Sequence, residues 1–127
     1  PYIRRRALRH LEKGRIVIIA GGTGNPFFST DSAAALRAAE LNCDLLVKGT
    51  KVDGVFESDP LLNNEAKKFS SISFSEVLEK ELAIMDMTAI TLCKENNLPI
   101  LVLDITKKEN LFNALNGDKN IGTKIGK

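Results

Sequence analysis

Apolar positions along this chain switch between helical and strand spacing. Near the start they recur every three or four residues, which predicts an amphipathic helix that stops at Gly14: Ile3, Ala7, Leu8 and Leu11. Continuous apolar runs at residues 16–20, 45–47 and 100–103 predict buried strands. The first of them, Ile-Val-Ile-Ile-Ala, is typical of a strand that is buried on both faces. The glycine-broken stretch at residues 121–125 predicts at most a short edge strand.

Helix start signals separate these strands. We expect Thr30 to cap a helix that runs through residue 41, with Asp31 in its first turn. Capping boxes, in which a Ser or Thr is followed three residues later by Glu, begin at Ser73 and at Thr106, and Asp86 is a candidate cap between them. Helices therefore alternate with strands, which predicts one α/β domain over residues 1–127 with a mainly parallel sheet.

Composition narrows the class of protein. The chain has 127 residues, 43% of them hydrophobic, and a net charge of +2, which is too small to argue for nucleic-acid binding. The two cysteines, Cys43 and Cys93, are far apart, and we expect them to be reduced, in or near the core, in a cytoplasmic protein. We expect neither a membrane span nor a signal peptide. Because the chain begins without Met, we expect it to be part of a longer protein.

The most informative segment is residues 21–31, between the first strand and the following helix. Its glycines can bring backbone N–H groups close to a phosphate, and its hydroxyls, amide and two aromatic rings can contact the rest of a ligand. We therefore expect a phosphorylated, nucleotide-like ligand here. Asp31 is the only carboxylate of the loop. It either interacts with the helix dipole or orients a lysine or a metal-bound nucleotide in an active site.

Residues 48–56 follow the second predicted strand and form either a simple turn or a second ligand site. Two ligand sites on one sheet edge would suit a transfer reaction. The arginine-rich first helix is best interpreted as a solvated face or a subunit contact. His10 has no cysteine or carboxylate cluster beside it, so we expect no metal site there. The chain has neither a Walker loop nor a Rossmann glycine motif.

Two stretches carry a family resemblance. Residues 20–34 read Ala-Gly-Gly-Thr-Gly-Asn-Pro-Phe-Phe-Ser-Thr-Asp-Ser-Ala-Ala, and residues 50–60 read Thr-Lys-Val-Asp-Gly-Val-Phe-Glu-Ser-Asp-Pro. They resemble the bacterial uridylate (UMP) kinases of the amino acid kinase superfamily. The second stretch recurs across the superfamily, whereas the Gly-Thr-Gly-Asn-Pro-Phe-Phe loop is much more specific to UMP kinases. The resemblance extends over the whole chain.

The resemblance implies a three-layer α/β/α sandwich and transfer of the ATP γ-phosphoryl group to UMP, with Mg²⁺ and with no metal-ligating residue assigned. It implies that Asp31 positions catalytic lysines. The ATP site would include Thr50, Phe56 and Asp59. The UMP site would be formed by Thr23, Gly24, Asn25, Pro26, Phe27, Phe28, Ser29 and Thr30. It also implies a homohexamer, GTP and UTP as effectors, a cytoplasmic place in pyrimidine biosynthesis, and no membrane or nucleic-acid partner.

The family's chains are about twice as long. The resemblance places this chain in their C-terminal half, without the N-terminal half that carries a phosphate-clamping lysine and a glycine-rich loop. We therefore expect this polypeptide alone to be inactive. Two alternatives stay open: a carboxylate-phosphorylating amino acid kinase, such as a glutamate or acetylglutamate kinase, and a non-catalytic nucleotide-sensing or nucleic-acid-binding module.

Overall fold

A single mixed sheet organises the chain. The structure, a computed structural model, describes residues 1–126, so Lys127 of the expected domain lies outside the described residues. The strands are ordered β1-β3-β4-β2. The pairs β1–β3 and β2–β4 are parallel, and β3–β4 is antiparallel. The prediction of an α/β fold with a mainly parallel sheet is confirmed. The strands are β1 (Leu46–Thr50), β2 (Ser71–Ile72), β3 (Ile100–Asp104) and β4 (Thr123–Ile125).

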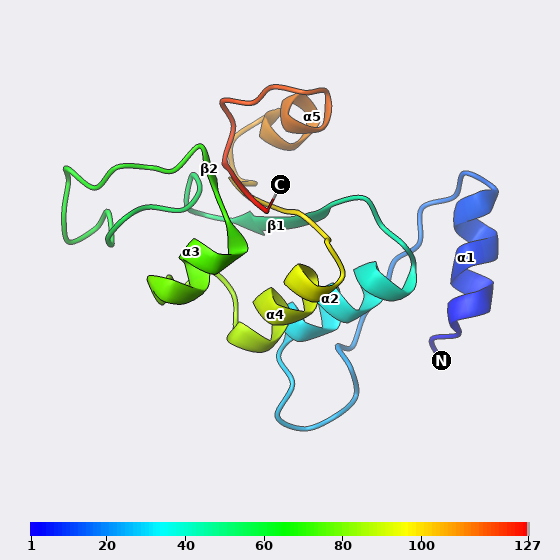
Figure 1. The fold of residues 1–127 in the computed structure, drawn as a ribbon. Coiled ribbons are helices and arrows are strands. Elements are labelled where there is room, and N and C mark those ends of the chain that lie inside the picture. The colour runs from blue at the N-terminus through cyan, green and yellow to red at the C-terminus, as the bar shows by residue number, and fades with distance from the viewer. Residues whose placement is uncertain (127) are drawn as a thin grey trace.

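Helices lie on both sides of this sheet. Figure 1 shows α5 on one side and α2, α3 and α4 on the other, which gives the expected α/β/α layering. The first helix, α1, stands at one end of the molecule and joins the rest through an extended segment. The helices are α1 (Arg4–Glu12), α2 (Thr30–Glu40), α3 (Phe74–Glu79), α4 (Met87–Glu95) and α5 (Asn110–Leu115).

The core lies between the sheet and the layer of α2, α3 and α4. Val77, Ile90, Ile100 and Ile125 are fully buried there. The buried side of α2 consists of small residues, three of them alanines, so α2 and α4 pack closely against each other. This close packing brings the N-terminal ends of the two helices together, and the candidate site is built at these ends.

Two of the predicted caps are confirmed. Ser73 and Glu76 form a reciprocal capping box at α3, in which Glu76 N–H donates to Ser73 Oγ and Ser73 N–H donates to the Glu76 carboxylate. Asp86 caps α4, since its Oδ1 accepts from Ala89 N–H at 2.8 Å. Both are local patterns that sequence alone specifies.

The predictions of two other helix caps are wrong. Thr30 is the first residue of α2, and Ser29 is its N-cap. The capping box predicted at Thr106 does not form, because the Thr106 N–H and Oγ1 both donate to Asp104 Oδ1, at 2.9 and 2.7 Å. The residue before α5, Glu109, instead has a left-handed backbone with φ 66°. The Thr106 hydroxyl is hydrogen-bonded to the Asp104 carboxylate and therefore does not cap a helix.

The prediction of a buried strand at residues 16–20 is wrong. The segment is extended but has no strand partner within residues 1–126, and Ile16 and Ile18 are 94% and 90% exposed. The edge-strand prediction for the C-terminal stretch is also wrong, because β4 pairs on both of its sides. Both errors concern which strands are neighbours, and local apolar patterns do not specify neighbours.

Cys43 and Cys93 are both free thiols. Cys93 is buried as expected, whereas Cys43 is exposed. No helix in the described part of the chain is long and apolar enough to cross a membrane.

Candidate functional site

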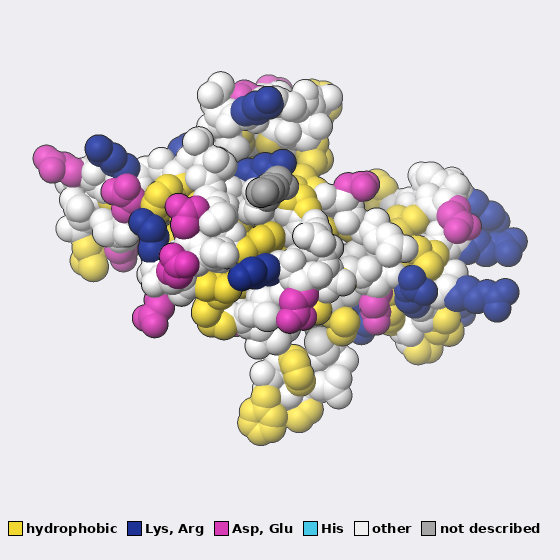
Figure 2. All heavy atoms as spheres, in the orientation of Figure 1, with side chains coloured by type: hydrophobic (Ala, Val, Ile, Leu, Met, Phe, Trp, Pro, Cys, Tyr) yellow, Lys and Arg dark blue, Asp and Glu magenta, His cyan; other side chains and the backbone are white. Residues whose placement is uncertain are grey.

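The glycine-rich loop before α2 projects from the body of the molecule, and its tip forms an exposed apolar knob (Figures 1 and 2). Gly21, Gly22 and Gly24 have φ of 84°, 65° and 75°, which turns the chain sharply. Phe27 also has a positive φ, 68°, and its side chain is fully exposed. Five residues of the predicted UMP set thus lie at the solvent-facing end of the loop: Gly24, Asn25, Pro26, Phe27 and Phe28.

The other end of the loop is anchored by one carboxylate. Ser29 Oγ accepts from Ser32 N–H at 3.2 Å, which caps α2, and donates to the carboxylate of Asp86. Ser32 Oγ donates to the same carboxylate at 3.1 Å. Asp86 also caps α4 through Ala89 N–H. The loop, α2 and α4 therefore meet at the side chain of Asp86.

The protonation of Asp86 reflects this position. Burial acts to raise the pKa of its carboxyl, but the hydrogen bonds from Ser29, Ala89 N–H and Ser32 and the nearby Lys48 charge outweigh burial. The pKa of Asp86 is therefore lowered from its usual value. The carboxylate is charged at neutral pH and accepts every one of these bonds.

A lysine and an aspartate form an ion pair beside this junction. Lys48 Nζ, from the middle of β1, donates to both carboxylate oxygens of Asp31 at 2.9 and 3.1 Å. It also donates to the backbone oxygen of Ile84 at 2.8 Å. The two side chains are 26% and 29% exposed, so both charges remain partly accessible. Asp31 is also in the first turn of α2, so the structure contains both interactions considered from the sequence.

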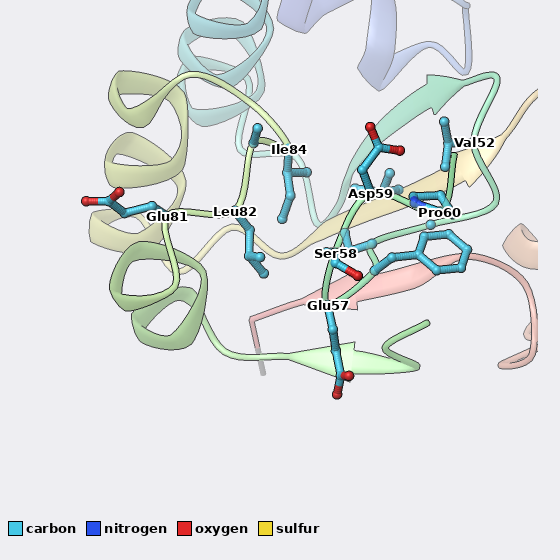
Figure 3. Close-up of a pocket in the computed structure, with 13 residues that line it drawn as sticks. Val52, Glu57, Ser58, Asp59, Pro60, Glu81, Leu82 and Ile84 are labelled. Carbon is cyan, nitrogen blue, oxygen red and sulfur yellow. The ribbon is translucent and has the colours of Figure 1, made fainter. Parts of the chain in front are cut away.

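A cavity of about 370 Å³ lies near this ion pair, although neither Asp31 nor Lys48 lines it. The chain that follows β1 forms one wall, with Ser58, Asp59 and Pro60, and the segment before α4 forms the facing wall, with Leu82 and Ile84 (Figure 3). The carboxylates of Glu57 and Glu81 point out of it in this view. Phe56 and Asp59 of the predicted ATP set line this cavity. Ile84, whose backbone oxygen accepts from Lys48 Nζ, lines this cavity.

A second cavity, of about 570 Å³, lies between the loop, the N-terminal half of α2 and the length of α4. Thr23 and Phe28 from the loop line it, together with Ser32 and Leu36 of α2 and Thr91 of α4. Ser32 therefore touches both this cavity and Asp86, and it is the neighbour in sequence of Asp31. Neither Asp31 nor Lys48 lines either cavity, but their neighbours do: Ile84 lines the first and Ser32 lines the second.

Three of the predicted site residues also make hydrogen bonds within local turns. Thr50 Oγ1, at the end of β1, accepts from Val52 N–H and donates to Val52 O, both at 2.8 Å. Asp59 Oδ1 accepts from Leu61 N–H at 2.8 Å. Thr23 Oγ1 accepts from Asn25 N–H at 3.1 Å. Thr50 lines neither cavity.

Sequence reasoning missed two members of this site. Lys48 was interpreted as part of a segment that forms either a turn or a second ligand site, and no partner was predicted for it, although a partly buried lysine needs one. Asp86 was assigned only as a helix cap. Its bonds to Ser29 and Ser32 bridge 57 and 54 positions of sequence, which no local pattern reveals.

The site therefore combines a glycine-rich loop at the start of a helix, a partly exposed ion pair and two adjacent hollows on a mainly parallel sheet. This arrangement is typical of an α/β protein that brings two ligands together. The model of the amino acid kinase family matches residues 2–104, and the chain belongs to this family.

Named relatives are more specific. The chain is 56% identical over 126 residues to a protein from Arabidopsis thaliana named uridylate kinase PUMPKIN, chloroplastic. The matched region covers 99% of this chain and 37% of that protein. It matches the crystal structure of UMP kinase from Bacillus anthracis with a TM-score of 0.96 and 38% identity. It matches UMP kinase from Ureaplasma parvum with a TM-score of 0.92 and 37% identity. The two structural matches cover 99% of this chain, which spans 52% and 54% of those chains.

Proposed function

We propose that this chain forms part of an enzyme that transfers the γ-phosphoryl group of ATP to UMP, giving UDP. It would form the C-terminal portion of the kinase domain. The observation that carries the proposal is the Asp31–Lys48 pair, whose neighbours Ile84 and Ser32 line two cavities, one of them also lined by the glycine-rich loop. Phosphoryl transfer needs a donor and an acceptor on either side of fixed charge, with no covalent intermediate. The relatives named UMP or uridylate kinases support the acceptor.

The roles of the residues follow from their positions. The loop from Thr23 to Thr30 would hold UMP, with backbone N–H groups toward the phosphate and the exposed rings of Phe27 and Phe28 against the base. Stacking of a base on an aromatic ring contributes about 1–3 kcal/mol. The cavity lined by Phe56 and Asp59 would hold ATP, with Thr50 shaping the chain that enters it.

Asp31 and Lys48 would act on the transferred group as a unit. The two bonds from Lys48 to the Asp31 carboxylate and the one to Ile84 O fix the ammonium group in place. A fixed cation stabilises the charge on a transferring phosphoryl group without reorganisation. Asp31 would therefore position the lysine rather than react itself.

Mg²⁺ would enter with ATP as its phosphate complex. In the described residues no group of three or more His, Cys, Asp or Glu side chains is arranged to hold a metal ion. Mg²⁺ commonly relies on substrate phosphates and water with one or two carboxylates. The single carboxylate of Asp31, which already contacts Lys48, fits this kind of binding, in which the substrate phosphates hold most of the Mg²⁺ coordination.

The test is UDP formation from UMP and Mg-ATP in a coupled assay. It uses this chain alone and this chain joined to the part of the Bacillus anthracis UMP kinase that it does not span, hereafter the joined enzyme. Lys48→Met and Asp31→Asn should each lower kcat of the joined enzyme at least about 100-fold, as expected for loss of fixed charge stabilisation. Lys94→Met, an exposed lysine on α4, is the matched control. Equal loss in all three variants, or phosphorylation of glutamate or acetylglutamate instead of UMP, would overturn the proposal.

The loop assignment has its own test. Thr23→Ala combined with Asn25→Ala should weaken UMP binding by the joined enzyme more than ATP binding, measured by calorimetry. The reverse order would exchange the two sites. UMP binding without any turnover would instead favour a sensing module, and binding that weakens steeply with salt would favour a nucleic-acid partner.

We also propose the finer properties that the family resemblance implies: a homohexamer, regulation by GTP and UTP, and a place in pyrimidine nucleotide synthesis in the cytoplasm. Analytical ultracentrifugation of the joined enzyme tests the hexamer, and rates with added GTP or UTP test the effectors. The Arabidopsis relative is named as chloroplastic. Imaging of the tagged native protein beside cytoplasmic and organelle markers therefore decides the compartment.

A further inference from the structure

The long connection between β1 and β2 leaves the sheet and returns to it (Figure 1). We define residues 54–69 of this connection as the arm. At its base Phe69 N–H donates to Val55 O at 2.9 Å, so the two ends of the arm lie side by side. Residues 54–60 form one wall of the cavity of about 370 Å³ described above (Figure 3). The conformation at the base of the arm therefore sets the shape of this wall.

One buried hydroxyl joins both ends of the arm to the sheet. Thr123, the first residue of β4, is fully buried. Its Oγ1 accepts from Val55 N–H at 2.9 Å and donates to the backbone oxygen of Phe69. Thr123 also pairs across the sheet with Val102, which lines the same cavity. The hydroxyl therefore fastens the arm to the sheet next to the cavity wall.

The backbone is shaped to reach this hydroxyl. A Cβ at Gly54 would lie 2.5 Å from Thr123 Oγ1, and Gly54 has a φ of 132°, which other residues rarely adopt. A second tie to the arm is ionic: Lys68 Nζ lies 3.2 Å from Asp53 Oδ2, and the two side chains are 28% and 38% exposed. Ion pairs with this exposure are weak and are screened by salt. The buried hydroxyl is therefore the firmer of the two ties.

We propose that Thr123 is a positioning residue for the donor nucleotide, whose hydroxyl holds the arm in the conformation that binds ATP. This inference rests on the proposed function, which assigns ATP to this cavity. A buried N–H or C=O group that loses its partner is destabilised, so removal of the hydroxyl frees both ends of the arm. A cavity that is competent only part of the time binds its ligand more weakly in proportion. Thr123 lines neither cavity, so the transfer step itself should not depend on it.

The test compares Thr123→Val, which keeps a similar side-chain shape without the hydroxyl, with Thr123→Ser, which keeps the hydroxyl. In the joined enzyme, calorimetry should give a Kd for ATP at least about tenfold higher for Thr123→Val and close to wild type for Thr123→Ser. The Kd for UMP should stay unchanged, because no arm residue lines the other cavity. The KM for ATP should rise while kcat at saturating ATP stays nearly constant.

Ile125→Val is the matched control for stability. Ile125 is fully buried in the same strand, and loss of one of its carbon atoms should lower Tm without removing a bond to the arm. The ATP Kd of this variant should therefore match wild type. Equal losses of ATP affinity in Thr123→Val and Ile125→Val would make Thr123 merely structural and would overturn the inference. Wild-type ATP affinity in Thr123→Val would overturn it as well.

A measurement on the wild-type joined enzyme keeps the test decisive if Thr123→Val does not fold. Coupling between two sites is reciprocal, so saturating ATP should slow hydrogen exchange at the Val55 and Phe69 amides, and saturating UMP should not. ATP that binds without protecting these amides would overturn this inference alone. A wild-type joined enzyme that binds UMP but no ATP would instead overturn the proposed function, and the inference with it.

Discussion

Replacing Asp86 by alanine removes the side chain on which the glycine-rich loop, α2 and α4 converge. Its carboxylate accepts from Ser29 and Ser32 hydroxyls and from Ala89 N–H, which caps α4. Ser32 is 5% exposed, so its hydroxyl cannot simply turn to water after the substitution. We therefore expect Asp86→Ala to destabilise the chain well beyond the loss of an ordinary surface carboxylate.

The expected loss of folding free energy is the sum of two contributions, the N-cap of α4 and a hydrogen bond to a charged carboxylate. Loss of an N-cap costs about 1 kcal/mol. A hydrogen bond to a charged group contributes about 1.5–3 kcal/mol, and the partly exposed site favours the lower end of this range. Together these contributions make about 2.5 kcal/mol for Asp86→Ala, which lowers Tm by about 10 °C for a chain of this size. Asp86→Asn keeps an acceptor for the cap but loses the charge that strengthens the hydrogen bonds from Ser29 and Ser32, and it should cost about 1 kcal/mol.

Urea unfolding followed by circular dichroism measures these differences. Asp118→Ala is the matched control, because Asp118 is an exposed aspartate that accepts only from Asn120 N–H in a local turn. If Asp86→Ala were no more destabilising than Asp118→Ala, the junction would contribute nothing, and the reasoning would be refuted. The order Ala, then Asn, then wild type must also hold for the free energy of unfolding.

The same residue makes stability depend on pH. The pKa of Asp86 in the folded chain lies below its usual value, which is about 3.9 for an unfolded aspartate. Its contribution is therefore fully present above about pH 4 and is lost as pH falls through the lowered folded pKa. The stability difference between wild type and Asp86→Asn should shrink over this range. A difference that stays constant from about pH 6 to pH 3 would contradict the assigned hydrogen bonds.

Two further predictions concern backbone and thiol accessibility. Gly122→Ala places a Cβ 2.2 Å from a backbone oxygen of β3 at φ 72°, whereas Gly117→Ala, at φ 98°, meets open space. Gly122→Ala should therefore cost several times as much as the strain of about 1–2 kcal/mol expected at Gly117, and equal urea midpoints would disprove this. Burial raises the pKa of the Cys93 thiol to about 11, so iodoacetamide at pH 8 should modify exposed Cys43 quickly and Cys93 only after unfolding. Mass spectrometry that finds equal rates would contradict its burial.

Local signals explain what the sequence predicted correctly. Strand β3 is largely an apolar run and β1 begins with one, and the caps at Ser73 and Asp86 need only the residues of their own turn. The loop that begins at Gly21 was recognised as the candidate ligand loop because glycines and polar groups occur together between a strand-like run and a helix. In each case the information lies within about ten residues of the chain.

Partners far apart in the chain explain the rest. The ion pair from Lys48 to Asp31 crosses 17 positions, and the bond from Ser29 to Asp86 crosses 57. Neither choice of partner follows from a local pattern. The burial of residues 16–20 was predicted from their own apolarity, but burial also requires a neighbour, and residues 1–126 provide no strand beside them.

Asp86 also changes where an anionic ligand can be held. Its charge lies at the N-terminal ends of both α2 and α4, so it already compensates the positive ends of two helix dipoles. A phosphate that approached either helix end would meet this negative charge first. In the proposed kinase, the loop amides around Gly22 and Gly24 and the ammonium group of Lys48 would therefore be left to attract the phosphate, which would bind away from the helix axes and toward β1.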